Sequence, residues 1–411
     1  MKGLALALML AAAPAAAQTI EEAEGSTMAE PRAEVTEAGF RDWIAAFRAT
    51  ALEAGVPGAE YDRQMRTAAL LPDVVRRDRN QNEFTKTIWD YLDIAVSDER
   101  VAMGQKALAR HAALFDRLEA EYGVEKEVIA AVWGLESGFG TFRGNTDTLS
   151  ALATLAYDGR RAAFFEAQLV QALKILSEGH VSRKDMQGSW AGAMGHTQFM
   201  PTSWAEFAVD ADGDGRRNLW GDDPADALAS TANYLRHWGW TRGQKWGLEV
   251  RLPEGFDYDQ TSERVKKPVA DWRALGVVPA AGGTLPDGPE ASVLLPAGAT
   301  GPAFLIFPNF QVIEKYNLAD AYVIGIGHLA DRLAGGPAFA ADWPRHWRAL
   351  TLDERKELQQ RLTDAGYLAP GGVDGRIGPK TVAAVKAWQK ARGLTSDGYA
   401  SPDVLAGLRG G

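Results

Sequence analysis

The sequence predicts a mainly α-helical protein with a small strand-containing insertion and a separate three-helix domain at its C-terminus. Three observations support this prediction. Apolar residues recur at helical spacing through most of the chain from Phe40 onward. Between residues 248 and 308, proline and glycine become frequent and short apolar runs replace the helical spacing. After a break that contains glycine and proline, helical spacing returns over residues 349–411.

The composition is typical of a soluble globular protein. Of the residues, 46% are hydrophobic and 24% are charged. The length of 411 residues is enough for two or three domains with sizeable cores. The net charge of -10 argues against nucleic acid as a partner. Because the chain has no cysteine, disulfides, thiol nucleophiles, zinc–thiolate sites and a lipid-modified cysteine are excluded. The 13 Trp and 10 Tyr residues suit either sugar stacking or core packing.

The first 17 residues are typical of an export signal. Lys2 precedes an apolar stretch, Leu4–Ala13, and the small residues Ala15–Ala17 offer a cleavage site. This stretch is too short to span a bilayer, and no later apolar run is longer. We therefore expect a soluble periplasmic protein. Residues 18–36 are acidic and poor in large apolar side chains, which predicts a flexible lead-in.

Residues 37–342 are expected to form one helical domain. Its first helix has Phe40, Trp43, Ile44 and Phe47 on one face. Further helices are expected at Thr87–Ile94, Gly104–Tyr122, Val124–Leu135, Arg161–Leu176, Asp226–Trp238 and Asp320–Leu333. The stretch 248–308 is expected to contain strands at Ser292–Leu295 and Phe304–Phe307. Since helices flank this stretch on both sides, we interpret it as an insertion.

The sequence of residues 349–411 predicts three short helices, which follow a domain boundary at Gly335–Pro344. In the first helix, Leu358 and Leu362 lie one turn apart, and a C-terminal cap is expected at Gly366. Pro379 suits the first position of the second helix, and Ser401-Pro402 is typical of an N-cap followed by a helix start.

A single glutamate stands at the end of an apolar helix pattern. The apolar stripe of this helix consists of Val128, Ile129, Val132 and Leu135. Glu136 lies on or beside that stripe, and the glycines after it place it in the last turn, near the negative end of the helix dipole. Burial and the dipole both raise the pKa of a carboxyl, as a general acid that protonates a glycosidic oxygen requires. The alternative is a structural glutamate paired with an arginine such as Arg143.

An acidic loop offers a second kind of carboxylate site. Asp210, Asp212 and Asp214 occupy positions one, three and five of a pattern that matches the opening of an EF-hand calcium loop. The closing glutamate is missing, because position twelve is Gly221. The residues that could replace it are Asp222, Asp223 and Asp226. Structural calcium and a plain acidic turn are both open, and no cofactor is expected to be required.

Taken together, these motifs resemble the lytic murein transglycosylase B family. The resemblance covers residues 40–334. It rests on Val-Trp-Gly-x-Glu at Glu136, Gly-Ala-Met-Gly-x-x-Gln-Phe-Met-Pro at Gly192–Pro201, and Asp-Gly-Asp-Gly before Leu219-Trp220. It continues with Ala232–Leu235, Asn309-Phe310, Tyr316-Asn317 and Tyr322. Residues 349–411 resemble the common peptidoglycan-binding domain through Gly366–Leu368, Asp374-Gly375 and Trp388-Gln389.

The resemblance implies a lysozyme-like helical core that cleaves the β-1,4 bond between N-acetylmuramic acid and N-acetylglucosamine and leaves a 1,6-anhydromuramoyl end. By position, Glu136 matches the general acid and base. The residues that match the substrate cleft are Tyr91, Ser189, Met194, Gln198, Tyr234, Tyr316 and Tyr322. Asp226 matches the late metal ligand, although Gly221–Asp223 lengthens the segment before it.

Two other functions compete with this one. The first is a muramidase that hydrolyses the same bond, for which Asp147 and Asp158 are the nearest downstream second carboxylates. The second is a non-catalytic scaffold that only holds the cell wall, but a scaffold would not need Glu136 on an apolar stripe. The expected partners are peptidoglycan glycan strands, with other cell-wall enzymes as further candidates, and the protein is expected to be a monomer.

Overall fold

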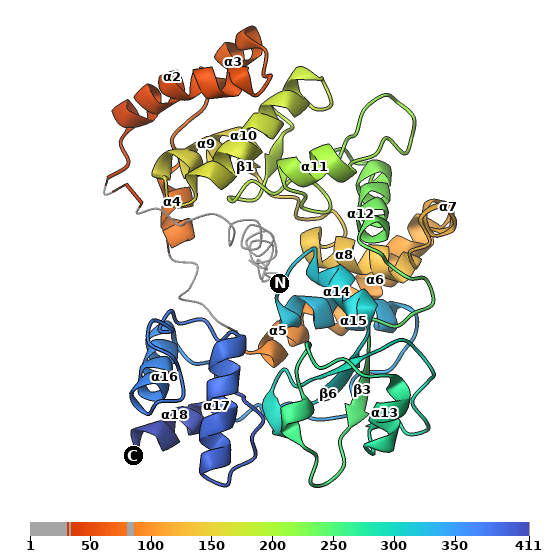
Figure 1. Ribbon diagram of the computed structural model, residues 1–411. Helices are drawn as coiled ribbons and strands as arrows, with labels where there is room; N and C mark the ends of the chain where they lie inside the picture. Colours follow the sequence, from red (N-terminus) through yellow and green to blue (C-terminus); the bar gives the residue numbers. More distant parts are fainter. Residues whose placement is uncertain (1–30, 33, 80–85, 411) are drawn as a thin grey trace, which may run out of the picture. The chain divides into compact units, whose positions relative to one another are not determined.

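The computed structural model describes residues 31–410 except for residue 33 and residues 80–85 (Figure 1). The export signal predicted at residues 1–17 and most of the lead-in predicted at 18–36 lie outside the described residues. The chain divides into two compact units. The helical unit contains the described residues up to 79, residues 98–242 and residues 312–334, and the mixed unit contains 86–97, 243–311 and 335–410. In the described part of the chain, no helix is long and apolar enough to cross a membrane.

The helical unit contains most of the predicted helices. Its helices are α2 (Glu37–Glu53), α3 (Gly58–Met65), α4 (Pro72–Arg79), α6 (Asp98–Arg110), α7 (Ala112–Tyr122), α8 (Lys126–Ser137), α9 (Thr148–Asp158), α10 (Ala162–Ser177), α11 (Pro201–Phe207), α12 (Ala225–His237) and α15 (Asp320–Leu333). The strands β1 (Thr146–Asp147) and β2 (Gln187–Gly188) pair antiparallel. The helix α14 (Pro308–Glu314) carries the chain from the mixed unit into the helical unit.

The helix predicted at Gly104–Tyr122 is wrong in one respect, because it is two helices that meet at His111. The backbone of His111 leaves the helical region, with φ −112° and ψ 29°. Its ring packs edge-on against Trp133, with 5.7 Å between ring centroids. A contact with a residue this far along the chain cannot be inferred from apolar spacing within one helix.

The helix α8 is the buried centre of the helical unit. Every side chain from Val128 to Ser137 is buried, and the helix packs against α6, α7, α12 and α15. A helix that is covered on all sides is a core helix rather than a surface one. Gly134 lets the Phe139 ring lie against the helix backbone, since a Cβ at this position would come within 2.6 Å of the ring.

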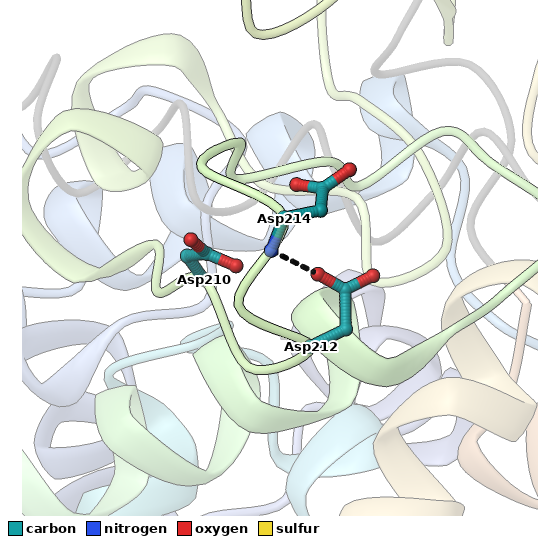
Figure 2. Close-up of side chains that lie close together, drawn as sticks. All are labelled: Asp210, Asp212 and Asp214. Carbon is teal, nitrogen blue, oxygen red and sulfur yellow. Dashed lines mark hydrogen bonds between the residues drawn. The ribbon is translucent and has the colours of Figure 1, made fainter.

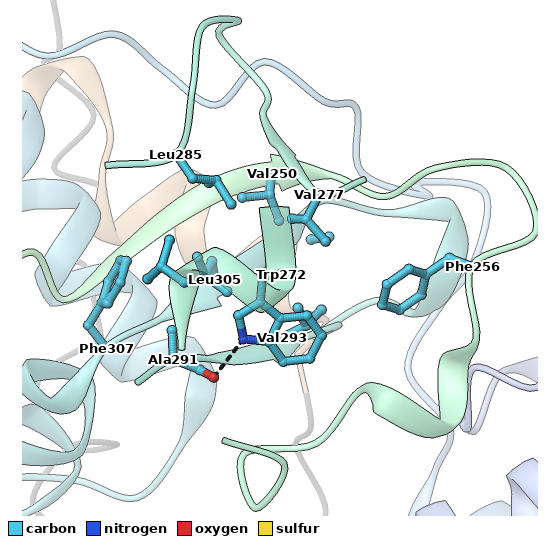
Figure 3. Close-up of a cluster of buried hydrophobic side chains, with 11 residues drawn as sticks. Val250, Phe256, Trp272, Val277, Leu285, Ala291, Val293, Leu305 and Phe307 are labelled. Carbon is cyan, nitrogen blue, oxygen red and sulfur yellow. Dashed lines mark hydrogen bonds between the residues drawn. The ribbon is translucent and has the colours of Figure 1, made fainter. Parts of the chain in front are cut away.

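The mixed unit contains the predicted strands in a four-stranded antiparallel sheet of order β4-β3-β6-β5. The strands are β3 (Gly247–Arg251), β4 (Val278–Pro279), β5 (Ser292–Leu294) and β6 (Ala303–Ile306). The helices α5 (Ile88–Ala95) and α13 (Val269–Ala274) and the short 3-10 turns η1 (Tyr258–Gln260) and η2 (Gly298–Thr300) complete this part. Trp272 is fully buried among the apolar side chains of the sheet and donates from Nε1 to the carbonyl of Ala291 at 2.8 Å (Figure 3).

The last part of the mixed unit forms the three predicted helices, α16 (Leu352–Asp364), α17 (Pro379–Ala391) and α18 (Pro402–Arg409). Their apolar faces meet in a core of their own, in which Leu358, Val385 and Trp388 are almost completely buried. Pro379 occupies the first turn of α17, as predicted. The predicted N-cap is also present, because the Ser401 side chain accepts from the Val404 amide at 3.2 Å.

These three helices contact the strand-containing part of the same unit. The Lys386 ammonium donates to the carbonyl oxygens of Tyr258 and Thr261, each at 2.7 Å. An Asp397 carboxylate oxygen accepts from the Ala299 amide at 2.8 Å. The C-terminal helices therefore dock on the predicted insertion through buried or half-buried polar contacts.

The segment Gly335–Pro344, predicted to be a domain boundary, also contacts the sheet. The amides of Ala340 and Ala341 both donate to the Glu249 carboxylate at 2.7 Å. The Phe339 ring packs edge-on against Phe304 with 5.0 Å between centroids. This segment is therefore held at residues 339–341 by the strand-containing part.

Candidate active site

Glu136 lies in the last turn of α8, as the sequence predicted, and is 2% exposed. One carboxyl oxygen accepts a hydrogen bond from the hydroxyl of Tyr322 on α15 at 2.6 Å. Burial raises the pKa of Glu136 to about 8, while the hydrogen bond from Tyr322 favours the anion and acts in the opposite direction. The carboxyl therefore holds its proton at neutral pH.

The turn that ends α8 directly after Glu136 is unusual. Gly138 has φ 57° in the left-handed region, which glycine adopts at little cost. Phe139 follows with φ 57°, a conformation that costs a non-glycine residue roughly 1–3 kcal/mol. Its ring lies edge-on to Trp133 at 5.8 Å between centroids, and this packing holds the strained turn in place. Gly140 then donates from its amide to the Ser137 hydroxyl at 3.0 Å.

Three tyrosines that the sequence placed in the cleft form a cluster with Glu136. The rings of Tyr316 and Tyr322 are stacked, with 6.5 Å between centroids, and Tyr234 meets Tyr316 edge-on at 5.0 Å. The hydroxyl of Tyr316 donates to the Thr197 carbonyl at 2.7 Å, and the hydroxyl of Tyr234 donates to the Lys315 carbonyl. Burial, followed by the nearby Glu136 charge, raises the pKa of Tyr316 well above its usual range. Tyr322 is the member of this cluster whose hydroxyl contacts the carboxyl.

The glycine-rich segment around residues 188–201 supplies one hydrogen-bond donor and one hydrogen-bond acceptor. The Ser189 hydroxyl oxygen accepts from the amides of Ala191 at 3.3 Å and Ala193 at 3.1 Å, so its own proton is available to a ligand. Gln198 has a positive φ of 53°. Its Nε2 donates to the carbonyl oxygens of Gly195 at 2.8 Å and Arg143 at 3.2 Å, which leaves the side-chain carbonyl as an acceptor. Met194 is fully buried.

His196 is a residue of this site that the sequence analysis missed. Trp133 donates from Nε1 to Nδ1 of His196 at 3.1 Å, so the imidazole proton is on Nε2, which donates to the Gly221 carbonyl at 2.7 Å. The hydroxyl of Ser137 donates to the His196 carbonyl at 2.5 Å. Burial lowers the pKa of His196 to about 4, and the ring stays neutral. The signal available in the sequence was a histidine inside the glycine-rich segment Gly192–Pro201.

Arg143, the alternative partner for Glu136, has other contacts. Its guanidinium donates to the carbonyls of Trp220, at 2.7 Å, and Gly221, and it forms an ion pair with Asp222 at 3.3 Å. Among the described residues, Glu136 forms no ion pair. The interpretation of Glu136 as a paired surface glutamate is therefore wrong.

Both sequence candidates for a second carboxylate form ion pairs with arginines. Asp158 is 1% exposed and forms an ion pair with Arg79 at 2.5 Å. The Asp147 carboxylate accepts from the Ser150 hydroxyl and from the guanidinium of Arg183. In each case one carboxylate oxygen has these partners, and the other is buried without a hydrogen-bond partner among the described residues.

The acidic loop brings Asp210, Asp212 and Asp214 together at the surface, with their carboxylate oxygens within 4.8 Å of one another. Figure 2 shows the three side chains on one turn, with the Asp214 amide donating to Asp212 at 3.1 Å. Three carboxylates are hard oxygen donors of the kind that calcium prefers. Asp226 lies outside this group, because its two oxygens accept from the amides of Ala211 and Asn218, each at 2.7 Å.

The comparisons with known proteins decide the family. Residues 39–331 match the family model described as the transglycosylase SLT domain. The chain belongs to this transglycosylase family. Residues 351–408 match a second model, the putative peptidoglycan binding domain. Membrane-bound lytic murein transglycosylase B of Escherichia coli (strain K12) is 35% identical over 220 residues, which are 52% of this chain and 58% of that relative. The chain thus spans little more than half the length of that relative.

Solved structures of transglycosylases are similar along more of the chain. SltB3 from Pseudomonas aeruginosa, in complex with NAG-anhNAM-pentapeptide, is 47% identical with a TM-score of 0.88, over 90% of this chain and 99% of that one. The Escherichia coli lytic transglycosylase Slt35, in complex with calcium, is 29% identical with a TM-score of 0.62, over 72% of this chain and 92% of that one. These matches confirm the predicted family, the lysozyme-like mainly α fold and the C-terminal peptidoglycan-binding domain. The relatives are enzymes, and so is this family member.

One predicted cleft residue of this transglycosylase lies in the mixed unit. Tyr91 is on α5 and is half-buried. The other predicted substrate-binding residues, Ser189, Met194, Gln198, Tyr234, Tyr316 and Tyr322, all belong to the helical unit. The part that each of them takes in binding stays a prediction.

Proposed function

We propose that this transglycosylase cleaves the β-1,4 bond between N-acetylmuramic acid and N-acetylglucosamine in peptidoglycan and leaves a 1,6-anhydromuramoyl end. The observation that carries the proposal is the buried Glu136 carboxyl, whose pKa of about 8 keeps it protonated at neutral pH. A similar structure, SltB3, is in complex with NAG-anhNAM-pentapeptide, a fragment that contains an anhydro sugar. SltB3 is also in complex with NAG-NAM-pentapeptide, so that relative binds both the anhydro fragment and the fragment that lacks the anhydro ring.

In the first step, Glu136 protonates the glycosidic oxygen while the bond from that oxygen to C1 of the muramoyl sugar breaks. One Glu136 oxygen accepts a hydrogen bond from Tyr322. The other oxygen accepts none from the described residues, so this second oxygen is the one that can reach the substrate. The Tyr322 hydrogen bond stabilises the carboxylate that this proton transfer leaves behind. General acid catalysis of this kind contributes about 10²–10⁴-fold.

In the second step, the C6 hydroxyl of the same sugar attacks C1 and its proton returns to Glu136. The attack closes the 1,6-anhydro ring and restores the protonated acid, so no water is consumed. A single carboxyl therefore serves first as acid and then as base. A pKa between those of a solvated carboxyl and a strong base suits both tasks.

Polar groups of the glycine-rich segment are suited to orient the sugar. Ser189 offers a hydroxyl proton and Gln198 offers a carbonyl oxygen, a pair that matches the acceptor and donor of an N-acetyl group. We propose that Tyr234 and Tyr316 border the cleft, and that Tyr322 acts on Glu136.

The alternative, hydrolysis of the same bond, needs a second carboxylate to activate water or to form a covalent intermediate. Asp147 and Asp158 are the sequence candidates, and arginines hold both of them. The test is mass spectrometry of the products from purified sacculi. Transglycosylation yields muramoyl ends that are lighter by one water than hydrolytic ends, so reducing muramic acid ends as the main product would contradict the proposal.

The C-terminal domain is proposed to hold the insoluble wall. It contains a pocket of about 250 Å³ whose apolar walls include Trp347, Trp388 and Leu394. The rings of Trp347 and Tyr399 are stacked, with 5.6 Å between centroids, and Leu394 is 52% exposed. An exposed leucine beside two aromatic rings is suited to the apolar faces of peptidoglycan. A second weak contact on a polymer raises the effective concentration of the catalytic site.

Two further proposals concern the location of the protein and a bound ion. Peptidoglycan lies in the cell envelope, so we propose that the chain acts in the periplasm after export. We also propose that Asp210, Asp212 and Asp214 hold a structural calcium ion, since the similar Slt35 structure is in complex with calcium. Asp226 would then shape the loop through its two amide contacts. The ion takes no part in the chemistry at Glu136.

A further inference from the structure

A cavity of about 520 Å³ lies in the helical unit beside the end of the catalytic helix. It is bounded by the end of α6, by the turn that follows α8, and by the segment after residue 220. Trp133 of α8 and Phe139, Gly140 and Thr141 of the following turn line it, whereas Glu136 does not. Trp133 precedes Glu136 by three residues, a rise of about 4.5 Å along the helix axis. The cavity is therefore close to the reacting carboxyl but separate from it.

Unpaired positive charge is the main chemical feature of this cavity. Lys106 and Arg110 are exposed, lie four residues apart on one face of α6, and form no ion pair within the described part of the chain. Arg143 adds a third cation, and its pair with Asp222 at 3.3 Å involves a carboxylate that is fully exposed. Asp222 contributes the single negative side chain of the lining.

The histidines of the lining do not change this balance. Burial lowers the pKa of both His111 and His196, so both rings are neutral donors and acceptors at neutral pH. The three cations of the lining are thus opposed by Asp222 and by the neighbouring Asp223, whose charge acts on both histidines, and one positive charge remains in excess in a chain whose net charge is -10. A local excess of positive charge on an acidic protein attracts anions to one place.

We propose that this cavity binds the carboxylates of the peptide that peptidoglycan carries on its muramic acid. The proposal rests on the proposed function and names a subsite for it. The sugars of the strand are largely neutral, whereas the peptide carries several carboxylates. Arginine forms paired hydrogen bonds with a carboxylate, and lysine adds a point charge. The volume of about 520 Å³ falls in the range of ligand-binding pockets.

Lys106 and Arg110 lie near the C-terminal end of α6, where the helix borders the cavity. Arg110 ends α6, and His111 breaks the helix so that α7 can turn away. Lys106 and Arg110 thereby face the turn after Glu136 across the cavity. A peptide held there would restrain the muramoyl sugar to which it is attached. The expected effect is on substrate affinity rather than on the chemical step.

The test compares two substrates that differ only in the peptide. Full-length enzyme is assayed on native glycan strands and on strands from which an amidase has removed the peptides. We expect Lys106→Gln combined with Arg110→Gln to raise KM on native strands by about tenfold, the effect of losing one charged hydrogen bond, without changing kcat. KM on stripped strands should be unchanged. The matched control is Arg66→Gln, an exposed arginine of the helical unit outside the cavity.

The outcomes separate the subsite from the overall function. An unchanged KM on native strands, or an equal rise in KM on both substrates, would overturn the subsite. Failure of the unmodified enzyme to produce anhydro ends from either substrate would instead overturn the proposed function. If circular dichroism shows that the double variant is unfolded, the test uses the unmodified enzyme alone. Its affinity is then measured for a disaccharide with and without the pentapeptide, and equal affinities would overturn the subsite.

Discussion

Glu136 and the Asp210–Asp214 loop place the same chemical group in opposite surroundings. The Glu136 carboxyl is 2% exposed, accepts one hydrogen bond, and has a pKa of about 8 because burial disfavours its anion. The three aspartates are exposed, and backbone amides of their own loop donate to them. The difference shows that the surroundings, and not the residue type, make one carboxyl a proton donor and the others candidate cation ligands.

The largest expected effect is the loss of activity when the buried carboxyl is replaced. Glu136→Gln keeps the size and polarity of the side chain but removes the transferable proton, so turnover on sacculi should fall by about 10²–10⁴-fold. Circular dichroism and sacculus binding should be nearly unchanged. The matched control is Glu127→Gln, a half-buried position in the first turn of α8, which should keep its rate. A rate within tenfold of wild type would argue that Glu136 is not the acid.

The same burial predicts a pH dependence of stability that Glu136→Gln should remove. The folded-state pKa of about 8 lies above the usual glutamate value of 4.5, so the stabilisation from the neutral carboxyl is complete below pH 4.5. As the pH rises from 4.5 to 8, the free energy of unfolding of the wild type should fall by about 1.4 kcal/mol per pH unit relative to that of the variant. Denaturant unfolding of both proteins at a series of pH values measures this difference. Parallel curves would contradict the burial of an ionisable group at this position.

Tyr322→Phe should sharpen the comparison by removing the one group that favours the anion. The hydrogen bond from Tyr322 lowers the pKa of Glu136, so its loss should raise that pKa. The alkaline limb of the rate profile, where the acid loses its proton, should then move to higher pH. A limb that moves to lower pH would mean that Tyr322 acts in some other way.

Removing calcium should act on the exposed carboxylates and not on the buried one. If the ion binds only the folded state, chelation should lower the melting temperature of the wild type. The combined variant Asp212→Asn and Asp214→Asn should melt at the same temperature with and without calcium. Asp42→Asn, an exposed acid on α2, serves as the control and should respond like the wild type. A wild-type melt that is independent of millimolar calcium would leave the loop as a plain acidic turn.

The smallest effect on chemistry is expected in the C-terminal domain. Leu394→Asp places a charge at the rim of the Trp347 pocket and should weaken binding to whole sacculi while short soluble strands are cleaved at close to the full rate. Leu275→Asp is the matched control, because Leu275 is 41% exposed in the same unit and does not line the pocket. Equal sacculus binding by the two variants would remove Leu394 from the wall-binding surface.

Local patterns predicted much of the fold and the central residue of the site. The helix that carries Glu136, its glycine stop and the N-cap at Ser401 follow from spacing and capping within a few residues. Contacts between distant segments could not be predicted in this way. The break at His111 and the partners of Arg143 depend on residues brought together only by folding. Likewise, nothing in the sequence of the segment Gly335–Pro344 indicates that it lies along the sheet.

The most direct test of the account is a titration of the Glu136 carboxyl itself. Carbon-13 labelling of glutamate side chains, with Glu136→Gln used to assign the signal, follows its protonation by NMR as the pH rises. We expect a single carboxyl signal that is absent from the variant and titrates with a pKa near 8, because the carboxyl is buried. If that carboxyl titrated with a pKa near the usual glutamate value of 4.5, Glu136 would be ionised at neutral pH, and its role as the acid of this transglycosylase would be contradicted.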